Sequence, residues 1–191
     1  MTAAHLTPIP GPAAEFGASL RAALPRIETP RCVLRAPVLE DAHLWIEIMC
    51  ADEAGHLGGP FDATRAFNEF AATVGTWLLR GHGLWSVTDH DDRLLGFVLI
   101  GFEPGDQEPE LGFLFAESAR GQGYAREAAE AARRHALGPM GLSRLVSYID
   151  PGNAPSRRLA ERLGARFDGT LGFEGTEARV EVWRHAQEGL Q

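Results

Sequence analysis

Hydrophobic residues recur with helical spacing in two early segments of the chain. In residues 42–49 apolar side chains fall at positions i, i+3, i+4 and i+7, and a longer stripe with the same kind of spacing covers residues 63–78. Gly81 follows the second stripe as a stop signal. We therefore expect two amphipathic helices, joined by the glycine-rich loop GHLGGPFD at residues 55–62.

Short β-prone runs predict that much of the remaining chain forms strands. The predicted strands are residues 31–35, 84–88, 94–102, 110–115 and 143–149, with two late ones around 170–173 and 178–184. The sequence DHDD at residues 89–92 is typical of a hairpin turn between two of them. Two further helices are expected, one ending near Leu137 and a short one over residues 155–163.

The order of these elements predicts an α/β protein with a mixed sheet. Strands that follow one another directly pair antiparallel, whereas the strand–helix–strand unit from Glu110 to Ile149 needs a right-handed crossover and hence a parallel pair. We expect a mostly antiparallel sheet with helices on both faces. Residues 1–26 begin with a stretch rich in proline and alanine and are expected to form a partly flexible extension, with one short helix over residues 13–24.

Composition narrows the classes of partner. The chain has 191 residues, of which 45% are hydrophobic, enough for a core, and its formal net charge is −8. An acidic chain is a poor electrostatic partner for nucleic acid or an anionic membrane, and it mildly attracts cationic ligands such as amines. The sequence has neither an apolar run of about 20 residues, as a membrane helix needs, nor the pattern of a secretory signal. We expect a soluble cytoplasmic protein without nucleic-acid or membrane partners.

The cysteines and histidines show no spacing typical of a metal site. Cys32 and Cys50 are interpreted as reduced core thiols. The seven histidines do not cluster along the sequence, so no metal is expected. His56 and His82 flank the helix predicted over residues 63–78, and each is either solvated or placed at the edge of a pocket.

The stretch SARGQGYAREAA at residues 118–129 joins a predicted strand to a predicted helix. Gly121 and Gly123 allow positive φ angles and a close approach of backbone N–H groups, and the helix start adds unpaired N–H groups and the positive end of its dipole. With Arg120 as a nearby cation, the pattern fits either a pyrophosphate site or a plain tight turn. Arg126 stands where a dinucleotide-binding fingerprint needs a glycine or alanine, and the Gly-Lys-Ser/Thr of a P-loop is absent.

Three further segments accompany this loop in an order and spacing that resemble the GNAT acyltransferases. The loop signature of that family, R/Q-x-x-G-x-G/A, is matched by Arg120, Gly123 and Ala125. The segments IETPRCVLRAPVLEDA, PELGFLF and DPGNAPSRRLAERLGA are similar to the branch that includes ribosomal-protein N-terminal acetyltransferases. The resemblance covers residues 27 to 184, which implies a single GNAT domain over residues 27–187.

The resemblance implies acetyl-CoA as the acyl donor. In this family the loop binds the pyrophosphate of coenzyme A through backbone N–H groups, and the preceding strand pairs with the pantetheine arm through its main chain. Gly112 is a candidate bulge that would splay this strand from its parallel neighbour. The implied cofactor-binding residues are Phe113, Leu114, Phe115, Arg120, Gly121, Gln122, Gly123, Tyr124 and Ala125.

The resemblance also implies direct attack of a primary amine on the thioester. An alkylammonium with an ordinary pKa near 10.4 must lose a proton, which costs about 4–5 kcal/mol at pH 7, so Glu110 is implied as a base. Many members protonate the leaving thiolate with a tyrosine, but Ala160 occupies that position here, which leaves Ser156 or a water molecule. Asn153 is expected either to orient the cofactor arm or to cap a helix. The plain alternatives are a surface carboxylate for Glu110 and a first-turn helix hydroxyl for Ser156.

Two functions remain open at this point. The first is an acetyl-CoA-dependent N-acetyltransferase that acts on a protein N-terminus, a peptide or a small-molecule amine. The second is a non-catalytic acyl-CoA-binding or regulatory module on the same fold, because a fold does not fix a function. Dimers are common in the family, so the resemblance leaves room for a homodimer.

Overall fold

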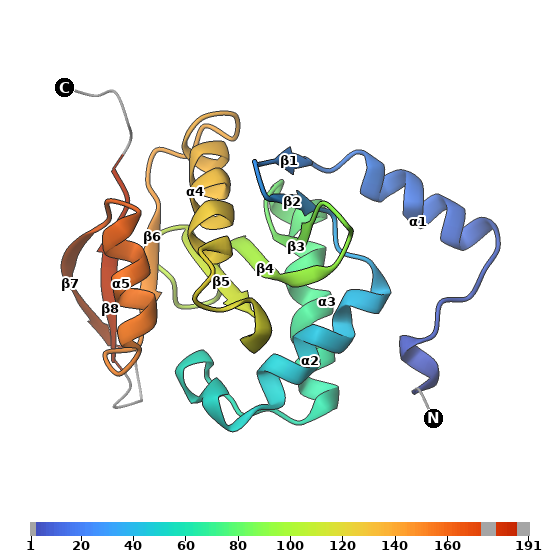
Figure 1. Ribbon diagram of the computed structural model, residues 1–191, viewed down its shortest axis with the longest axis horizontal. Coiled ribbons are helices and arrows are strands. Elements are labelled where there is room, and N and C mark those ends of the chain that lie inside the picture. The colour runs from blue at the N-terminus through green and yellow to red at the C-terminus, as the bar shows by residue number, and fades with distance from the viewer. Residues whose placement is uncertain (1–2, 173–178, 187–191) are drawn as a thin grey trace.

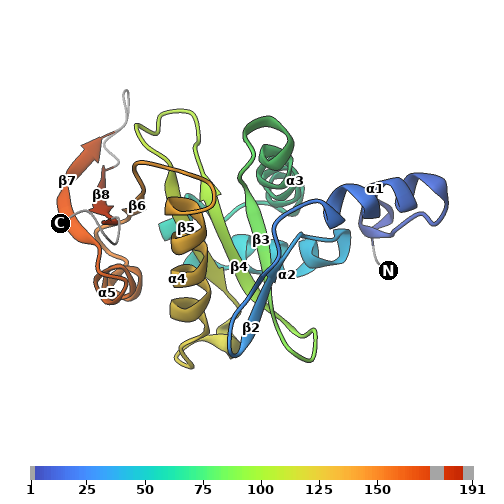
Figure 2. The same ribbon diagram turned by 90° about the horizontal axis from the view of Figure 1, so that it is seen from above.

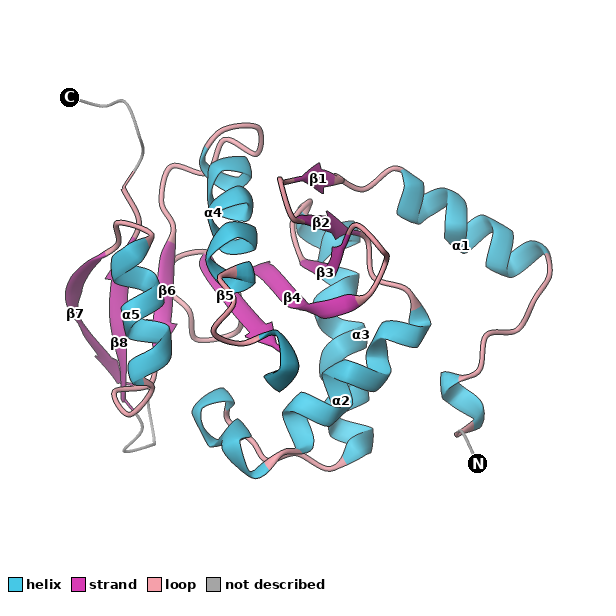
Figure 3. Cartoon of the chain, in the orientation of Figure 1, coloured by secondary structure: helices cyan, strands magenta, loops and turns pink. Residues whose placement is uncertain are grey.

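The computed structural model of the chain describes residues 3–172 and 179–186 and contains an eight-stranded sheet of order β1-β2-β3-β4-β5-β6-β8-β7 (Figures 1 and 3). The strands are β1 (Ile27–Glu28), β2 (Cys32–Arg35), β3 (Leu84–Asp89), β4 (Leu94–Gly101), β5 (Glu110–Phe115), β6 (Val146–Ile149), β7 (Arg166–Gly172) and β8 (Arg179–Arg184). Within the described residues, neighbouring strands pair antiparallel except β5 and β6, which pair parallel. The predicted mixed sheet with one parallel pair is confirmed.

The helices cover both faces of the sheet, as expected. They are α1 (Pro12–Ala22), α2 (Ala42–Cys50), α3 (Ala63–Arg80), α4 (Tyr124–Leu137) and α5 (Ala154–Arg162), with short 3-10 turns η1 (Ala4–Leu6), η2 (Leu39–Asp41), η3 (Asp52–Leu57) and η4 (Glu117–Ala119). Seen from above, α3 and α4 lie on opposite sides of the central strands (Figure 2). Along β4, Phe97 and Leu99 pack in a core cluster with α2 and α3, whereas Val98 and Ile100 pack in a cluster with α4. The alternation of side chains along one strand thus builds two cores.

The local sequence explains where the two largest helices begin and end. Asp62 accepts a hydrogen bond from the backbone N–H of Arg65 at 2.9 Å, which caps the start of α3, and Gly81 ends that helix with φ 73°. The core-facing side of α4 consists largely of alanines, which let this helix lie close to the sheet. The predicted helix over residues 63–78 and the helix ending at Leu137 are both confirmed.

The strands β5 and β6 diverge almost as soon as they have paired. Their register contains a single aligned pair, Glu110 with Val146, and β6 begins three residues later than the predicted strand over residues 143–149. The predicted bulge at Gly112 is wrong, because the register between β4 and β5 runs without a shift from residue 110 to residue 115. Gly112 instead makes room for Leu99, whose side chain would lie 3.0 Å from a Cβ at that position. The splay therefore arises from the path of β6 and not from a bulge in β5.

The N-terminal segment contains the helix predicted over residues 13–24, which is present as α1 (Pro12–Ala22). No residue of α1 is buried, and Phe16 and Leu20 are 65% and 42% exposed. Leu6 of η1, by contrast, packs against the core cluster of α2 and α3. Among the described residues, no helix is both long enough and apolar enough to span a membrane.

Candidate active site

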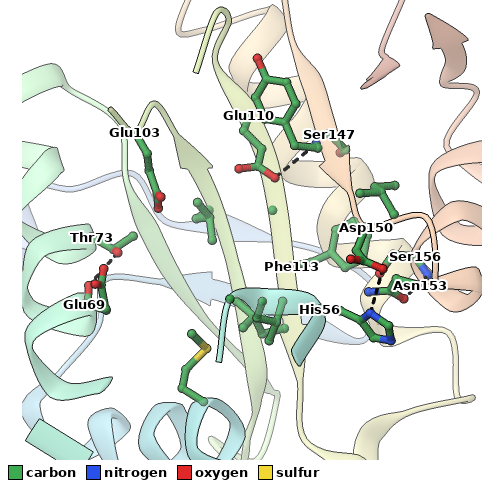
Figure 4. Close-up of a pocket in the computed structure, with 18 of the residues that line it drawn as sticks. His56, Glu69, Thr73, Glu103, Glu110, Phe113, Ser147, Asp150, Asn153 and Ser156 are labelled. Carbon is green, nitrogen blue, oxygen red and sulfur yellow. Dashed lines mark hydrogen bonds and ion pairs between the residues drawn. The ribbon is translucent and has the colours of Figure 1, made fainter. Parts of the chain in front are cut away.

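A cavity of about 390 Å³ lies where β5 and β6 separate and is bordered by residues of α2, α3 and η3 (Figure 4). Five of the predicted catalytic and cofactor-binding residues line it, namely Glu110, Phe113, Leu114, Asn153 and Ser156. Glu69, Thr73 and Glu103 lie on one side of the cavity, and His56, Asp150, Asn153 and Ser156 lie on the other. Glu110 at the start of β5 and Ser156 in the first turn of α5, the proposed base and the proposed proton donor, thus line one space.

Glu110 begins β5 and is the most strongly perturbed carboxyl group in this cavity. Burial, together with the nearby charges of Asp106 and Glu103, raises its pKa from the ordinary 4.5 to about 8. The backbone N–H of Tyr148 donates a hydrogen bond to Glu110 Oε1 at 3.4 Å, which acts in the opposite direction. A carboxyl group with this pKa exchanges a proton near neutral pH, as a general base must.

Carboxyl groups gather at the Glu110 end of the cavity. Glu69 from α3 and Glu103 from the β4–β5 turn line the same side of the cavity. Burial, together with the charges of Asp106 and Glu69, raises the pKa of Glu103. Arg65 offsets part of this charge, since its Nε lies 4.0 Å from Glu69 Oε1 and its guanidinium lies over the ring of Phe61. The residues come from separate segments of the chain, and sequence reasoning identified neither Glu69 nor Glu103.

The opposite wall of the cavity is formed by the turn after β6 and the start of α5. Asn153 Oδ1 accepts a hydrogen bond from the backbone N–H of Ser156 at 3.1 Å, so the side chain of Asn153 caps α5, one of its two predicted roles. On this same side of the cavity, His56 Nδ1 lies 3.0 Å from Asp150 Oδ1. His82 lies elsewhere: it is buried, and its Nδ1 contacts the carbonyl oxygen of Ile100 at 2.7 Å. Of the two histidines expected near a pocket, only His56 lines this cavity.

The glycine loop at residues 120–125 follows β5 and the short turn η4, and it lies outside the cavity lining. Gly121 and Gly123 have φ angles of 73° and 85°, which confirms the predicted left-handed conformation. Arg120 Nε donates to the carbonyl oxygen of Phe115 at 3.2 Å, and Gln122 Nε2 donates to that of Ser118 at 2.6 Å. Arg120 therefore also fixes the loop to the end of β5. The N–H groups of the first turn of α4, which starts at Tyr124, have no partner further back in the helix.

Other nominated residues belong to the frame of the site. Phe115 is 6% exposed and packs in the core cluster with α4 rather than in the cavity. Ala160 is fully buried in α5, and its methyl side chain cannot donate a proton to a leaving thiolate. Within residues 3–172 and 179–186, no group of three or more histidine, cysteine, aspartate or glutamate side chains is arranged to hold a metal ion.

The sequence also gave no indication of a contact between Arg31, near the start of the sheet, and the glycine loop. Arg31, between β1 and β2, donates from Nη1 to the carbonyl oxygen of Gln122 at 3.0 Å. The two residues are 91 positions apart, and no local pattern links them. Arg31 lies inside the segment that carried the family resemblance, so the segment was recognised while the contact was not.

Comparisons with known proteins agree with this geometry. The family model described as an acetyltransferase (GNAT) domain matches residues 31–166. The crystal structure of an acetyltransferase from Agrobacterium tumefaciens is similar to this chain with a TM-score of 0.80 and 31% identity, and the match covers 86% of this chain and 96% of that one. RimJ from Mycobacterium smegmatis, solved in complex with CoA-disulfide, shares the fold with a TM-score of 0.65 at 21% identity, covering 83% of each chain.

A curated relative in Bacillus subtilis, the uncharacterized N-acetyltransferase YnaD, is 32% identical over 79 residues. This match spans 41% of the present chain and 46% of YnaD, so the chain covers less than half of that relative's length. The family model, by contrast, covers most of the sheet, the glycine loop and the start of β7. With its match over more than half of the chain, it shows that the chain belongs to the GNAT acetyltransferase family.

Proposed function

We propose that this protein transfers an acetyl group from acetyl-CoA to a primary amine by direct attack in a ternary complex. The observation that carries the proposal is Glu110, a carboxyl group with a pKa of about 8 in the wall of a cavity. The strand that Glu110 begins leads directly to a glycine loop with the family's signature. With a base at one end of β5 and a pyrophosphate-binding loop beyond the other, a CoA thioester held along the strand could reach the base, as an acyl transfer requires.

Main-chain geometry supports coenzyme A as the carrier of the acyl group. Because β5 and β6 share one aligned pair and then separate, main-chain groups beyond Glu110 can pair with the two amides of a pantetheine arm. Phe113 and Leu114 line the cavity along this path. The loop at residues 120–125 would hold the pyrophosphate with its N–H groups. The similarly folded M. smegmatis RimJ was solved in complex with CoA-disulfide, which supports coenzyme A as a ligand to test.

The reaction needs one proton removed and one supplied. The amine nitrogen attacks the thioester carbonyl carbon, Glu110 takes the proton that the nitrogen loses, directly or through water, and the C–S bond breaks as the amide forms. The leaving thiolate takes a proton from the hydroxyl of Ser156, which a water molecule re-protonates, or from water directly, and the proton taken by Glu110 returns to the solvent. The products are the acetylated amine and the free thiol of coenzyme A.

The charge of the cavity supports a cationic acceptor. Glu69 and Glu103 face the same space as Glu110, and their negative charge would attract an alkylammonium or α-ammonium group before it is deprotonated. A small amine fits within about 390 Å³, as does the first residue of a peptide or protein N-terminus. The similarity of sequence segments to ribosomal-protein acetyltransferases places protein N-termini among the acceptors to test first.

The decisive experiment incubates the purified chain with acetyl-CoA and a panel of acceptors and follows the free thiol. The panel contains N-terminal peptides, polyamines, aminoglycosides and amino acids. Thiol release that saturates with one acceptor class, with a matching acetylated product by mass spectrometry, is the expected result. Saturable CoA binding without turnover on the whole panel would instead favour a non-catalytic acyl-CoA-binding module. Absence of CoA binding would contradict both functions.

A further inference from the structure

Arg31 and Glu127 form a junction between the β1–β2 turn and the first turn of α4. The backbone N–H of Arg31 donates to Glu127 Oε1 at 2.8 Å, and Arg31 Nε donates to Glu127 Oε2 at 2.7 Å. Thr29 Oγ1 donates to Glu127 Oε1 at 2.7 Å. Both carboxylate oxygens of Glu127 are therefore engaged, and they fix the direction in which the guanidinium of Arg31 extends.

The free end of this guanidinium holds the glycine loop. Arg31 Nη1 donates to the carbonyl oxygen of Gln122 at 3.0 Å, and the guanidinium carbon lies 4.9 Å from the centre of the Tyr124 ring. A Cβ built at Gly123 would lie 3.2 Å from Arg31 Nη2, so the arginine packs against the loop at this residue. Arg31 thus contacts three successive residues of the loop that follows β5.

The hydrogen bond to Gln122 determines where the next N–H group points. The peptide bond between Gln122 and Gly123 is trans, so its C=O and N–H point in opposite directions. Because the C=O is held toward Arg31, the N–H of Gly123 is turned away from it. Glycine adopts positive and negative φ angles with similar ease, so without a lock this peptide can rotate and present its carbonyl oxygen where its N–H had been. A carbonyl oxygen repels a phosphate, whereas an N–H group binds it.

We propose that Arg31, anchored by Glu127, is a positioning residue that holds the Gln122–Gly123 peptide with its N–H directed at the pyrophosphate of coenzyme A. The inference rests on the proposed function, since it requires the loop to bind that pyrophosphate. Arg31 acts through the loop and not by charge alone. Because the apparent affinity falls with the fraction of molecules in the binding-competent state, loss of the lock that leaves a tenth of the loops competent weakens CoA binding about tenfold.

A substitution at Glu127 distinguishes a positioning role of Arg31 from simple charge attraction, because the two explanations predict opposite changes in the affinity for coenzyme A. Changing Glu127 to glutamine removes a negative charge near an anion site, so attraction alone predicts tighter CoA binding. It also removes the anchor that directs Arg31, so positioning predicts weaker binding. Arg134→Gln is the matched control for loss of positive charge, because Arg134 is an exposed arginine of the same helix and pairs with Glu130.

The test measures dissociation constants of the full chain by calorimetry for coenzyme A and by NMR titration for pantetheine, which lacks the phosphates. We expect Arg31→Gln to weaken CoA binding about tenfold and Glu127→Gln to weaken it severalfold, while Arg134→Gln and all pantetheine affinities change less than about twofold. Melting temperatures identify any variant that does not fold. Since Arg31 is half exposed, Arg31→Lys, which keeps the charge without the forked donor set, serves as the second variant and is also expected to bind CoA more weakly.

Three results would overturn the inference. They are a Glu127→Gln variant that binds CoA as tightly as the parent or more tightly, an Arg31→Gln variant no weaker than Arg134→Gln, and an equal loss for CoA and pantetheine. A parent chain that does not bind CoA would instead overturn the proposed function, and the positioning role with it. The two failures are therefore distinguishable in the same set of titrations.

Discussion

The two ends of β5 are built from different parts of the polypeptide and suit opposite charges. Beyond Phe115, the loop with Gly121 and Gly123 presents main-chain N–H groups and the start of α4, which favour an anion. At Glu110, the cavity presents carboxyl side chains, which favour a cation. The first end is one continuous segment, whereas the second is assembled from α3, the β4–β5 turn and β5 itself.

This difference has a chemical consequence. A main-chain site fits any ligand with a pyrophosphate and varies little with side chains, which suits a donor common to a whole family. A side-chain site changes with single substitutions, which suits acceptors that differ between relatives. We therefore expect substitutions at the loop to act on the donor, and substitutions in the cavity to act on the acceptor or on the chemical step.

The largest effect is expected from Gly123→Trp, which changes the glycine loop at the anion-binding end of β5. Gly123 has φ 85°, and a Cβ there would lie 3.2 Å from Arg31 Nη2, so the loop must distort. We expect CoA binding to weaken by about 100-fold or more, since the backbone can no longer approach the pyrophosphate. Calorimetric titration with coenzyme A measures this loss.

Gly141→Trp is the matched control for Gly123→Trp. Gly141 also has a positive φ, 70°, but nothing lies within 4 Å of a Cβ built there, and it is in the turn after α4. Its substitution introduces similar backbone strain away from the loop, so CoA affinity should stay within about threefold of the parent. Equal losses in both variants would mean that strain, and not access to the pyrophosphate, explains the result.

The same contrast explains what could be predicted from the sequence. The loop, with its two positive-φ glycines and the helix after it, was predictable because its residues are contiguous and their backbone geometry follows from their type. The antiparallel pairing of successive central strands and the single parallel pair were predictable because strand succession and the crossover constrain pairing, whereas the insertion of β8 between β6 and β7 was not predicted. Glu69, Glu103 and the His56–Asp150 contact were not, because the fold brings together residues that no local pattern relates. The bulge assigned to Gly112 was wrong because a glycine in a strand can equally serve a packed neighbour, here Leu99.

The next largest effect is expected from Glu110→Gln, which removes the proposed base. We expect kcat to fall about 100-fold with little change in CoA affinity. Because the pKa of Glu110 is raised to about 8, the carboxylate form accumulates as the pH rises toward that value. The ratio of parent to variant rates should therefore increase with pH and level off above about pH 8. Titration of the acceptor amine affects both proteins and cancels in this ratio; a ratio that does not vary with pH would contradict the role of Glu110.

Glu110→Gln should also change how stability depends on pH. The fold favours the neutral carboxyl group, so the parent loses stability relative to the variant as the pH rises from the ordinary pKa of 4.5 to about 8. We expect the variant to melt no higher than the parent at pH 4 and about 10 °C or more above it at pH 9. Calorimetric melting curves at the two pH values measure this difference, and a gap of the same size at both would show that Glu110 does not titrate in this range.

A smaller effect is expected from Glu103→Gln, which weakens the carboxylate wall without touching the base. For a cationic acceptor we expect KM to rise about fivefold while the KM for acetyl-CoA stays unchanged. The charge of Glu103 raises the pKa of Glu110, so its removal should also move the pH midpoint of the rate to lower pH. Steady-state kinetics at several pH values test both effects. A rise in the KM for acetyl-CoA instead would contradict the assignment of the cavity to the acceptor and of the glycine loop to the donor.

The smallest effects are expected from two neighbours at the start of α5, and they separate a main-chain role from a chemical one. Asn153→Ala removes the oxygen that accepts the Ser156 N–H, so it should cost about 1 kcal/mol of folding free energy and leave kcat nearly unchanged. Ser156→Ala keeps that N–H and removes the hydroxyl, so it should lower kcat about threefold to tenfold without loss of stability. Denaturant unfolding and single-turnover rates on both variants distinguish the roles. If Asn153→Ala slowed the reaction more than Ser156→Ala, Asn153 would have to contact the cofactor arm in addition to capping the helix, and water would be the better candidate to protonate the thiolate.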